Sequence, residues 1–312
     1  MSGGRRSTPV ALLASGPTRV MGILNLTEDS FSDGGTHLAP EAALRHARRM
    51  VAEGASIVDV GAESTRPGAQ RVPADVELAR VVPIVTALAA AGVAVSVDTM
   101  RAEVAHASAE AGAAFINDVS GGLADPEMLP VVAASGIGYI TMHWRGHSER
   151  MQEQAVYADV VAEVCQELEA RVEAALAAGI RPDLLAVDPG LGFSKTTEHN
   201  WTLLAALDRL SQLAGRRWPL LVGASRKGFL GTLLASDGQP RPPLERDVAT
   251  AAITALVAQH RVWAVRTHEV VGQCDAVRVA EALRDRQRPL ASVGYGAGPT
   301  RSGPSERGEG RD

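Results

Sequence analysis

The sequence predicts an α/β fold of one domain, a (β/α)8 or TIM barrel, from three observations. Eight short, almost continuously apolar runs recur along the 312 residues, segments with helical spacing lie between them, and several of the runs end in polar residues. A continuous apolar run is typical of a strand that is covered on both faces in a parallel sheet. The polar residues then stand at the carboxyl ends of the strands, where such barrels carry their sites.

The eight apolar runs are the predicted strands. A doubly wound open sheet is the alternative fold, but it gathers its ligand groups at one switch point. Here polar residues end the first, third, fourth, sixth, seventh and eighth runs, which favours the closed barrel. Between the runs, apolar residues recur at helical spacing, as in Val161, Val164 and Leu168. The predicted strands occupy residues 20–25, 56–60, 93–97, 114–118, 137–142, 184–188, 219–223 and 262–267.

The barrel domain is predicted to span residues 19–288. Before it, residues 1–18 contain only a brief apolar patch, shorter than the roughly 7 to 15 residues of a signal-peptide core, so we expect a flexible leader. After it, residues 289–312 are rich in Gly, Pro, Ser and Arg without periodicity, which predicts a disordered tail.

The composition indicates a small molecule as the partner. A formal charge of -5, without a dense cluster of basic residues, argues against a nucleic-acid surface. The longest apolar stretch, residues 81–97, falls short of the roughly 20 residues that span a bilayer. The two cysteines, Cys165 and Cys274, are interpreted as packing residues rather than a disulfide or a metal site. We therefore expect a protein of the reducing cytoplasm that contacts neither nucleic acid nor membrane.

Acidic and amide side chains end three of the predicted strands. Asp98, Asn117 and Asp188 stand at the ends of strands three, four and six. Each alone is most simply an N-cap of the helix that follows. Together they would place two carboxylates and an amide around one cavity, an array suited to a flat heterocycle with N–H donors. A site built to hydrogen-bond such groups rejects analogues that lack them by roughly 10⁴- to 10⁵-fold.

Cationic side chains end strands seven and eight. Lys227 and Arg226 follow strand seven, and Arg266 and His268 end strand eight. The loops after these strands form the usual phosphate site of barrel enzymes, which predicts a bound anionic group. For Arg226 we favour a structural role, since neighbouring residues of a helical turn point in different directions.

Other polar residues are interpreted as structural. Asp59, inside strand two, is typical of a buried, hydrogen-bonded barrel residue. His143 and His147 lack a third ligand nearby and are expected to be loop histidines rather than a metal site. A different expectation applies to Asp33 and Arg66, in the first two loops, which could pair and latch a lid at a gain of about 0 to 1 kcal/mol.

Five motifs together resemble one family. They are the run from Asn25 to Gly35, Glu63-Ser64-Thr65-Arg66-Pro67-Gly68, Asp188-Pro189-Gly190, Ser225-Arg226-Lys227 and Arg266-Thr267-His268. In this order, and over residues 19–286, they closely resemble the bacterial dihydropteroate synthases of actinobacterial type. The resemblance implies an Mg²⁺-dependent transferase of folate biosynthesis. Such an enzyme joins (7,8-dihydropterin-6-yl)methyl diphosphate to 4-aminobenzoate and releases diphosphate and 7,8-dihydropteroate.

The same resemblance implies roles for single residues. Asn25 would bind Mg²⁺ and diphosphate, and the diphosphate would also contact Arg266 and His268. The pterin would be held by Asp98, Asn117, Asp188 and Lys227, with Met142 and Phe193 shaping its pocket. The aminobenzoate would be bordered by Thr65, Arg66, Pro67 and Ser225, and by Phe31 and Asp33 once two loops close. The residues implied in catalysis are Asp33, Arg66, Lys227, Arg266 and His268.

Small departures from the family pattern remove none of these groups. Leu26 and Glu28 replace the commoner Val and Pro of the first motif, and Thr267-His268-Glu269 replaces the commoner Val-His-Asp. Two alternatives remain open, a methyltetrahydrofolate-type methyltransferase and a non-catalytic pterin-binding homologue. The basic residues at the strand ends argue against the first, which needs no diphosphate site. The resemblance also implies a homodimer formed through the last helices.

Overall fold

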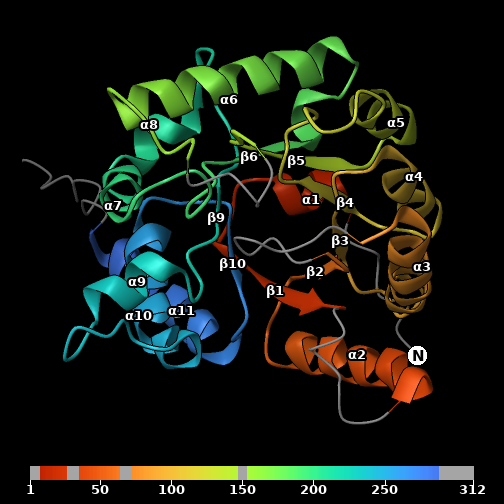
Figure 1. Cartoon of the computed structure of the whole chain (residues 1–312), viewed down its shortest axis with the longest axis horizontal. Coiled ribbons are helices and arrows are strands. Elements are labelled where there is room, and N and C mark those ends of the chain that lie inside the picture. The colour runs from red at the N-terminus through yellow and green to blue at the C-terminus, as the bar shows by residue number, and fades with distance from the viewer. Residues whose placement is uncertain (1–7, 27–34, 64–71, 147–152, 288–312) are drawn as a thin grey trace, which may run out of the picture.

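The computed structural model describes residues 8–26, 35–63, 72–146 and 153–287. Parallel strands occupy the middle of the molecule and helices form a ring around them (Figure 1). Helix α6 lies along one side of this ring, α3, α4 and α5 along a second, α2 opposite α6, and α9, α10 and α11 along the remaining side. The arrangement is the predicted (β/α)8 barrel, so the predicted fold class is confirmed.

Eight strands make one parallel sheet in the order β6-β5-β4-β3-β2-β1-β10-β9. A parallel bridge between Val187 and Leu220 joins the two edges, which closes the barrel. Every predicted strand is present to within two residues at either end, including strand seven, which is shortened to Leu221–Val222. The strands are β1 (Arg19–Asn25), β2 (Ile57–Gly61), β3 (Val95–Asp98), β4 (Phe115–Asp118), β5 (Gly138–Met142), β6 (Leu185–Asp188), β9 (Leu221–Val222) and β10 (Ala264–Thr267).

The helices cover the outer face of the sheet and shield its second apolar surface. Within the described ranges, no helix has both the length and the apolar character needed to cross a membrane. A two-stranded hairpin, β7 (Gln212–Leu213) and β8 (Arg216–Arg217), follows α8. The helices are α2 (Gly35–Ala52), α3 (Ala74–Ala90), α4 (Ala102–Glu110), α5 (Met128–Ser135), α6 (Val160–Ala177), η2 (Pro182–Leu184), α7 (Thr197–Leu204), α8 (Leu207–Ser211), α9 (Gly228–Leu233), η3 (Pro243–Arg246), α10 (Asp247–Gln259) and α11 (Val271–Gln287).

An apolar layer fills the barrel near the amino ends of the strands. Its members come from seven of the eight strands and from the residue before β10, and all are buried. The rings of Phe115 and Trp263 meet there, with centroids 5.6 Å apart. This layer gives the barrel a solid floor beneath its carboxyl end. The layer consists of Met21, Ile57, Phe115, Ile140, Ala186, Leu221, Trp263 and Ala264.

A short helix, α1 (Pro9–Leu13), closes the floor from below. Its Leu12 and Leu13 side chains are buried and join the apolar layer. The Trp263 indole N–H donates to the Leu12 carbonyl at 2.7 Å, which ties the helix to β10. The expectation of a flexible leader is therefore wrong for residues 8–18, which belong to the folded domain, because their apolar patch covers the open end of the barrel. Residues 1–7 and the predicted tail, 289–312, lie outside the described residues.

We predict that Gly138→Ala destabilises the barrel floor. Gly138 pairs with Phe115 across β5 and β4, and a Cβ at Gly138 would lie 2.2 Å from Phe115 Cδ1. Overpacking of this kind costs about 1–3 kcal/mol, to be measured by urea denaturation. Gly16→Ala is the control, since the nearest atom to its Cβ would be 3.8 Å away. Equal unfolding midpoints for the two variants would contradict the proposed packing of the floor.

Candidate functional site

A polar layer lies directly above the apolar floor, on the same inward face of the strands. Side chains two residues apart on a strand point to the same face. Ile57 is followed in this way by Asp59, Phe115 by Asn117, and Ala264 by Arg266. The same step leads from Ala186 to Asp188 and from Ile140 to Met142. The barrel therefore brings the predicted acceptors and the predicted arginine together at the carboxyl ends of the strands.

Arg266 links two strands at the centre of this layer. Its Nε donates to Asp59 Oδ2 at 2.6 Å, and one Nη donates to Asp98 Oδ2 at 2.7 Å. The Asn117 side-chain amide also donates to Asp59 Oδ2, at 3.2 Å. Burial raises the pKa of Asp98 to about 7, although Arg266 beside it opposes the rise. Burial disfavours the Arg266 cation, but Asp59 and Asp98 together raise its pKa.

The strand pairing places Asp98 and Asn117 level with each other. They are register partners on β3 and β4, and Asp98 is in turn the partner of Gly61 on β2. Gly61 leaves room for the aspartate, since a Cβ there would lie 3.3 Å from Asp98 Cβ. Gly61 pairs with Asn25 at the end of β1, so four strands contribute to one level of the rim.

Asp188 and Lys227 form the neighbouring part of the rim. Asp188, buried and paired in register with Met142, accepts a hydrogen bond from the Gly190 amide at 2.7 Å. Burial raises the pKa of Asp188, and Lys227 acts against this rise. The Lys227 ammonium donates to the Leu191 carbonyl and lies 4.9 Å from the centre of the Phe193 ring. Burial lowers the pKa of Lys227 to about 8, while Asp188 works to raise it.

Ser225 and His268 join the ends of strands seven and eight. Ser225 Oγ lies 3.0 Å from His268 Nδ1 and accepts from the His268 amide at 3.2 Å. Gly223, two residues before Ser225, lies between the Lys227 and Arg266 side chains. A Cβ at Gly223 would lie 3.8 Å from Lys227 Nζ and 3.9 Å from Arg266 Cβ. Lys227 and Arg266 are thus brought together beside the acceptors, and Ser225 ties His268 to the end of strand seven.

Arg226 and Asp59, interpreted as structural from the sequence, have structural contacts, and Asp59 also orders the site. Arg226 lies in the left-handed region, with φ 58°, and pairs with Asp247 of α10 through two contacts of 2.7 Å. It therefore lies outside the polar layer, as favoured from the sequence, although it is ion-paired and partly buried rather than simply exposed. Asp59 is fully buried and hydrogen-bonded, as expected, and it is also the residue that holds Arg266 and Asn117 in place.

Several predicted residues fall outside the described ranges. They are Phe31 and Asp33 of the first loop, Thr65, Arg66 and Pro67 of the second, and His147. Among the residues that are described, no three His, Cys, Asp or Glu side chains gather as a metal site.

One residue of the site was missed from the sequence. Lys195, which is only 3% exposed, lies two residues after Phe193 in the same loop and contacts His143. The composition could have pointed to Lys195, because the chain contains only two lysines, Lys195 and Lys227.

We predict that Asp59→Asn weakens the core of the site. The change leaves the Arg266 guanidinium with one carboxylate instead of two, and losing such a buried partner costs about 1–3 kcal/mol of unfolding free energy. Thermal and urea denaturation measure the loss. Asp183→Asn, at an exposed ion pair with Arg181, is the matched control and should change little. A stability loss no larger than that of the control would contradict the linking role of Asp59.

Comparison with known proteins agrees with this geometry. Residues 21–268 match the family model described as pterin binding enzyme. The dihydropteroate synthase of Mycobacterium leprae (strain TN) is 55% identical over 268 residues, which cover 85% of this chain and 93% of the relative. That of Streptococcus pyogenes is 43% identical over 269 residues, covering 86% of this chain and 96% of the relative.

Solved structures show the same likeness. Yersinia pestis dihydropteroate synthase, in complex with a sulfonamide drug, aligns with a TM-score of 0.79 at 41% identity over 86% of this chain and 95% of its own. The Burkholderia cenocepacia enzyme, complexed with 7,8-dihydropteroate, aligns with a TM-score of 0.78 at 41% identity over 87% of this chain and 93% of its own. The chain therefore belongs to the dihydropteroate synthase family of pterin-binding enzymes.

Proposed function

We propose that the polar layer catalyses the dihydropteroate synthase reaction. In this reaction, (7,8-dihydropterin-6-yl)methyl diphosphate and 4-aminobenzoate give 7,8-dihydropteroate and diphosphate. One observation carries the proposal: buried acceptors and strong cations share a single inward layer at the carboxyl end of the barrel. The bound 7,8-dihydropteroate of the Burkholderia relative is the product of this chemistry and supports it.

The pterin ring is assigned to the acceptors. Asp98, Asn117 and Asp188 offer oxygens to its ring and amino N–H groups, and Lys227 donates to its edge. Met142 is buried beside Asp188, and Phe193 lies against Lys227, so these two side chains shape the walls. Buried acceptors left unpaired are costly, which is why such a site selects for a ligand with matching donors.

The departing diphosphate is assigned to Arg266 and His268. A guanidinium has five N–H donors, and in the described part of the chain two of the Arg266 donors bind Asp59 and Asp98. The remaining donors suit phosphate oxygens. Attraction between unit charges 4 Å apart rises from about 1 kcal/mol in water to about 4 kcal/mol at an effective dielectric near 20. A partly buried arginine therefore stabilises the growing negative charge far better than an exposed one.

Magnesium is assigned to the diphosphate, with Asn25 as its protein ligand. The described residues around the rim offer an amide oxygen at Asn25 rather than a cage of carboxylates. Mg²⁺ usually keeps several waters and binds through one or two carboxylates plus substrate phosphates; here Asn25 would supply a neutral amide oxygen, so the diphosphate oxygens would be the charged ligands. When bound, the ion would supply further neutralisation of the leaving group.

Bond cleavage is proposed to precede bond formation. The C–O bond to diphosphate breaks with its electron pair leaving on oxygen, and the electron-rich pterin delocalises the positive charge on the methylene carbon. The aromatic amine then forms the C–N bond with its lone pair, and the proton released from the nitrogen passes to water. Since an arylamine is already a nucleophile, no strong general base is assigned.

The aminobenzoate pocket is proposed to lie beside Ser225, which contacts His268 at the rim. The family resemblance adds Thr65, Arg66 and Pro67, together with Phe31 and Asp33, whose roles remain proposals because they lie outside the described residues. The same holds for the catalytic roles of Asp33 and Arg66.

The test is product formation by the purified chain. With both substrates and Mg²⁺, diphosphate and 7,8-dihydropteroate should appear in equal amounts, and chelation of the metal should stop the reaction. Binding of the pterin without product would indicate the non-catalytic homologue considered from the sequence. Absence of both binding and product would refute the proposed function.

Asp188→Asn is the substitution that tests the pterin pocket most directly. It keeps the size of the side chain but removes the charged acceptor, and hydrogen bonds to charged groups contribute about 1.5–3 kcal/mol. We expect the Kd of 6-hydroxymethylpterin to rise about 10- to 100-fold in isothermal titration calorimetry, with the melting temperature close to that of the parent chain. An unchanged Kd would remove Asp188 from the pocket.

A homodimer through the last helices is also proposed. Large apolar side chains are exposed on η3, α10 and α11, and α10 packs against α11. Exposed apolar patches of this kind mark protein interfaces. The exposed side chains are Leu244, Val248, Leu256, Val271, Val279 and Leu283.

Substitutions in the proposed dimer interface should halve the mass of the particle in solution. Val248 is 83% exposed and Val279 is 65% exposed in the single chain. Replacing both with Glu should convert a dimer into a folded monomer, because a buried charge opposes association. Sedimentation velocity measures the change. A parent chain that already sediments as a monomer would refute the dimer.

The cytoplasm is proposed as the location. Cys165 and Cys274 are both free thiols, as a reducing compartment favours. The small-molecule substrates proposed above are intermediates of folate biosynthesis, which fits the same compartment.

A further inference from the structure

The chain uses lysine at only two positions. Of its 31 basic residues other than histidine, only Lys195 and Lys227 are lysines, and the remaining 29 are arginines. Both lysines lie at the carboxyl end of the barrel. Lysine differs from arginine because its compact amine can lose its proton when it is buried. Lys227 has a proposed role in the pterin pocket, whereas Lys195 has none.

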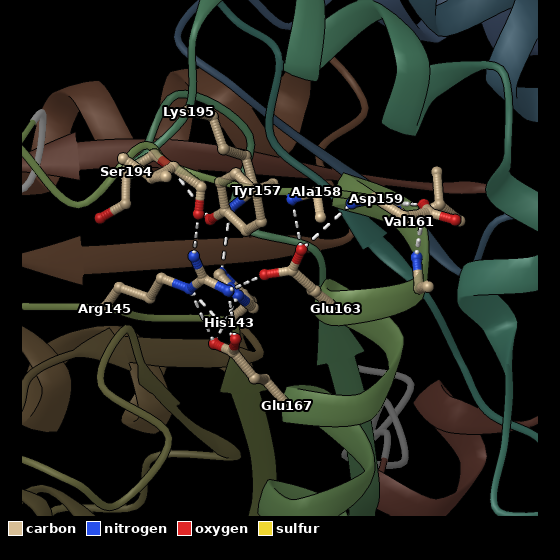
Figure 2. A network of polar contacts seen from close by, with 12 residues as sticks. His143, Arg145, Tyr157, Ala158, Asp159, Val161, Glu163, Glu167, Ser194 and Lys195 are labelled. Carbon is tan, nitrogen blue, oxygen red and sulfur yellow. Dashed lines mark hydrogen bonds and ion pairs between the residues drawn. The ribbon is translucent and has the colours of Figure 1, made fainter.

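Lys195 is buried between a histidine and a loop carbonyl. Its Nζ lies 3.0 Å from His143 Nδ1 and donates to the Phe193 carbonyl, also at 3.0 Å. The other ring nitrogen, His143 Nε2, lies 3.0 Å from Glu167 Oε2 (Figure 2). The contact is at ion-pair distance without hydrogen-bond geometry, and the charge of the carboxylate favours the tautomer that carries its proton on Nε2 and leaves Nδ1 to accept. Glu167, His143 and Lys195 therefore form a chain that ends on the Phe193 backbone.

A second set of contacts holds the next carbonyl of the same loop. Arg145 binds Glu167 and stacks on the Tyr157 ring, with its guanidinium carbon 3.9 Å from the ring centre. The Tyr157 hydroxyl donates to the Ser194 carbonyl at 3.0 Å (Figure 2). Ser194 has a φ of 48°, a left-handed conformation that costs a non-glycine residue energy and persists only when its surroundings hold it. The two sets of contacts thus clamp consecutive peptide units in a strained conformation.

The same loop, residues 189–195, also contacts the Lys227 side chain. The Leu191 carbonyl accepts from Lys227 Nζ, and the Phe193 ring lies against the same ammonium. Between them, Gly192 packs so closely that a Cβ there would lie 2.9 Å from Lys227 Cδ. Movement of the Phe193 carbonyl would therefore displace the loop groups that contact Lys227.

We infer that Lys195 is a positioning residue for the pterin pocket. Through the Phe193 carbonyl it fixes the loop of residues 189–195 in the conformation that holds Lys227, and His143 with Glu167 hold Lys195. The inference rests on the proposed function, because it takes Lys227 and Phe193 to be parts of that pocket. It assigns Lys195 no contact with the substrates.

The charges around Lys195 give the inference an independent signature. Burial lowers the pKa of Lys195 to about 7, Lys227 adds to this effect, and Asp188 opposes it, with smaller effects from Arg145 and Glu167. Burial also lowers the pKa of His143 to about 4, so the imidazole is neutral and can accept. Two amines that repel each other depress each other's pKa. Lys227 is still charged at the pH where Lys195 titrates, so removing Lys227 should raise the pKa of Lys195.

The experiment uses the full chain with ¹³C-labelled lysine. Its two lysines give two Cε signals, and Lys195→Met leaves one, which assigns the spectrum without ambiguity. In the ligand-free parent chain, both lysines should titrate well below the ordinary value of about 10.4. In Lys227→Met, the Lys195 signal should titrate at higher pH, and in Lys195→Met the affinity for the pterin should fall. The Kd of 6-hydroxymethylpterin should rise about tenfold, as expected for a lost hydrogen bond that orders the pocket.

Kinetics and matched variants separate positioning from a loss of folding. The KM for the pterin diphosphate should rise in Lys195→Met while the KM for 4-aminobenzoate stays within twofold and the melting temperature is kept. His143→Asn keeps an acceptor near the position of Nδ1, and His143→Leu does not. Pterin affinity should therefore fall further in His143→Leu than in His143→Asn. Arg181→Met, at an exposed ion pair, is the surface control and should leave every readout unchanged.

Each outcome decides the matter. An unchanged pterin Kd in Lys195→Met would overturn the inference. So would equal losses in the two His143 variants, a result that holds even if Lys195→Met fails to fold. If the parent chain binds no pterin, the proposed function fails, yet the ligand-free titrations of the parent chain and of Lys227→Met still show whether the two amines lie close enough to repel each other.

Discussion

The ion pairing of Arg266 with Asp59 and Asp98 is the interaction on which the rest of the site depends. A guanidinium inside a barrel is costly unless carboxylates meet it, and here two strands on one side of the barrel supply them to a third. The same contacts bind Asn117 through Asp59 and hold Asp98 in place. Acceptors and cation therefore stabilise each other, and neither set would tolerate burial alone.

The alternation of side chains along the strands explains why this cluster can exist. The inward positions of the floor are apolar, and on four strands the next inward position is polar, as in Ile57 and Asp59 or Phe115 and Asn117. The floor excludes water from below, and α1 seals it. The polar layer above is open only toward the loops, so charges there act at a low effective dielectric. Packing in the lower half of the barrel thus sets the strength of the chemistry in the upper half.

Much of the fold and part of the site could be predicted from the sequence, for physical reasons. Buried parallel strands are continuously apolar, so all eight were visible, and their ends located Asp98, Asn117, Asp188 and Arg266. The direct contact between Arg266 and Asp98 was not visible, since it depends on register across the closed barrel. Residues 8–18 were misjudged because a short apolar patch shows no partner in sequence. Lys195 was missed for the same reason, since its role depends on His143, which is far away in the chain.

The central claim is that one inward layer grips the pterin with acceptors on one side and receives the leaving group with cations on the other. A crystal structure of this chain with 7,8-dihydropteroate and diphosphate tests it most directly. The account predicts the pterin ring edge within hydrogen-bond distance of Asp98, Asn117 and Asp188, and diphosphate oxygens on Arg266 and His268. Density for the pterin away from these acceptors, or diphosphate bound without Arg266, would contradict it.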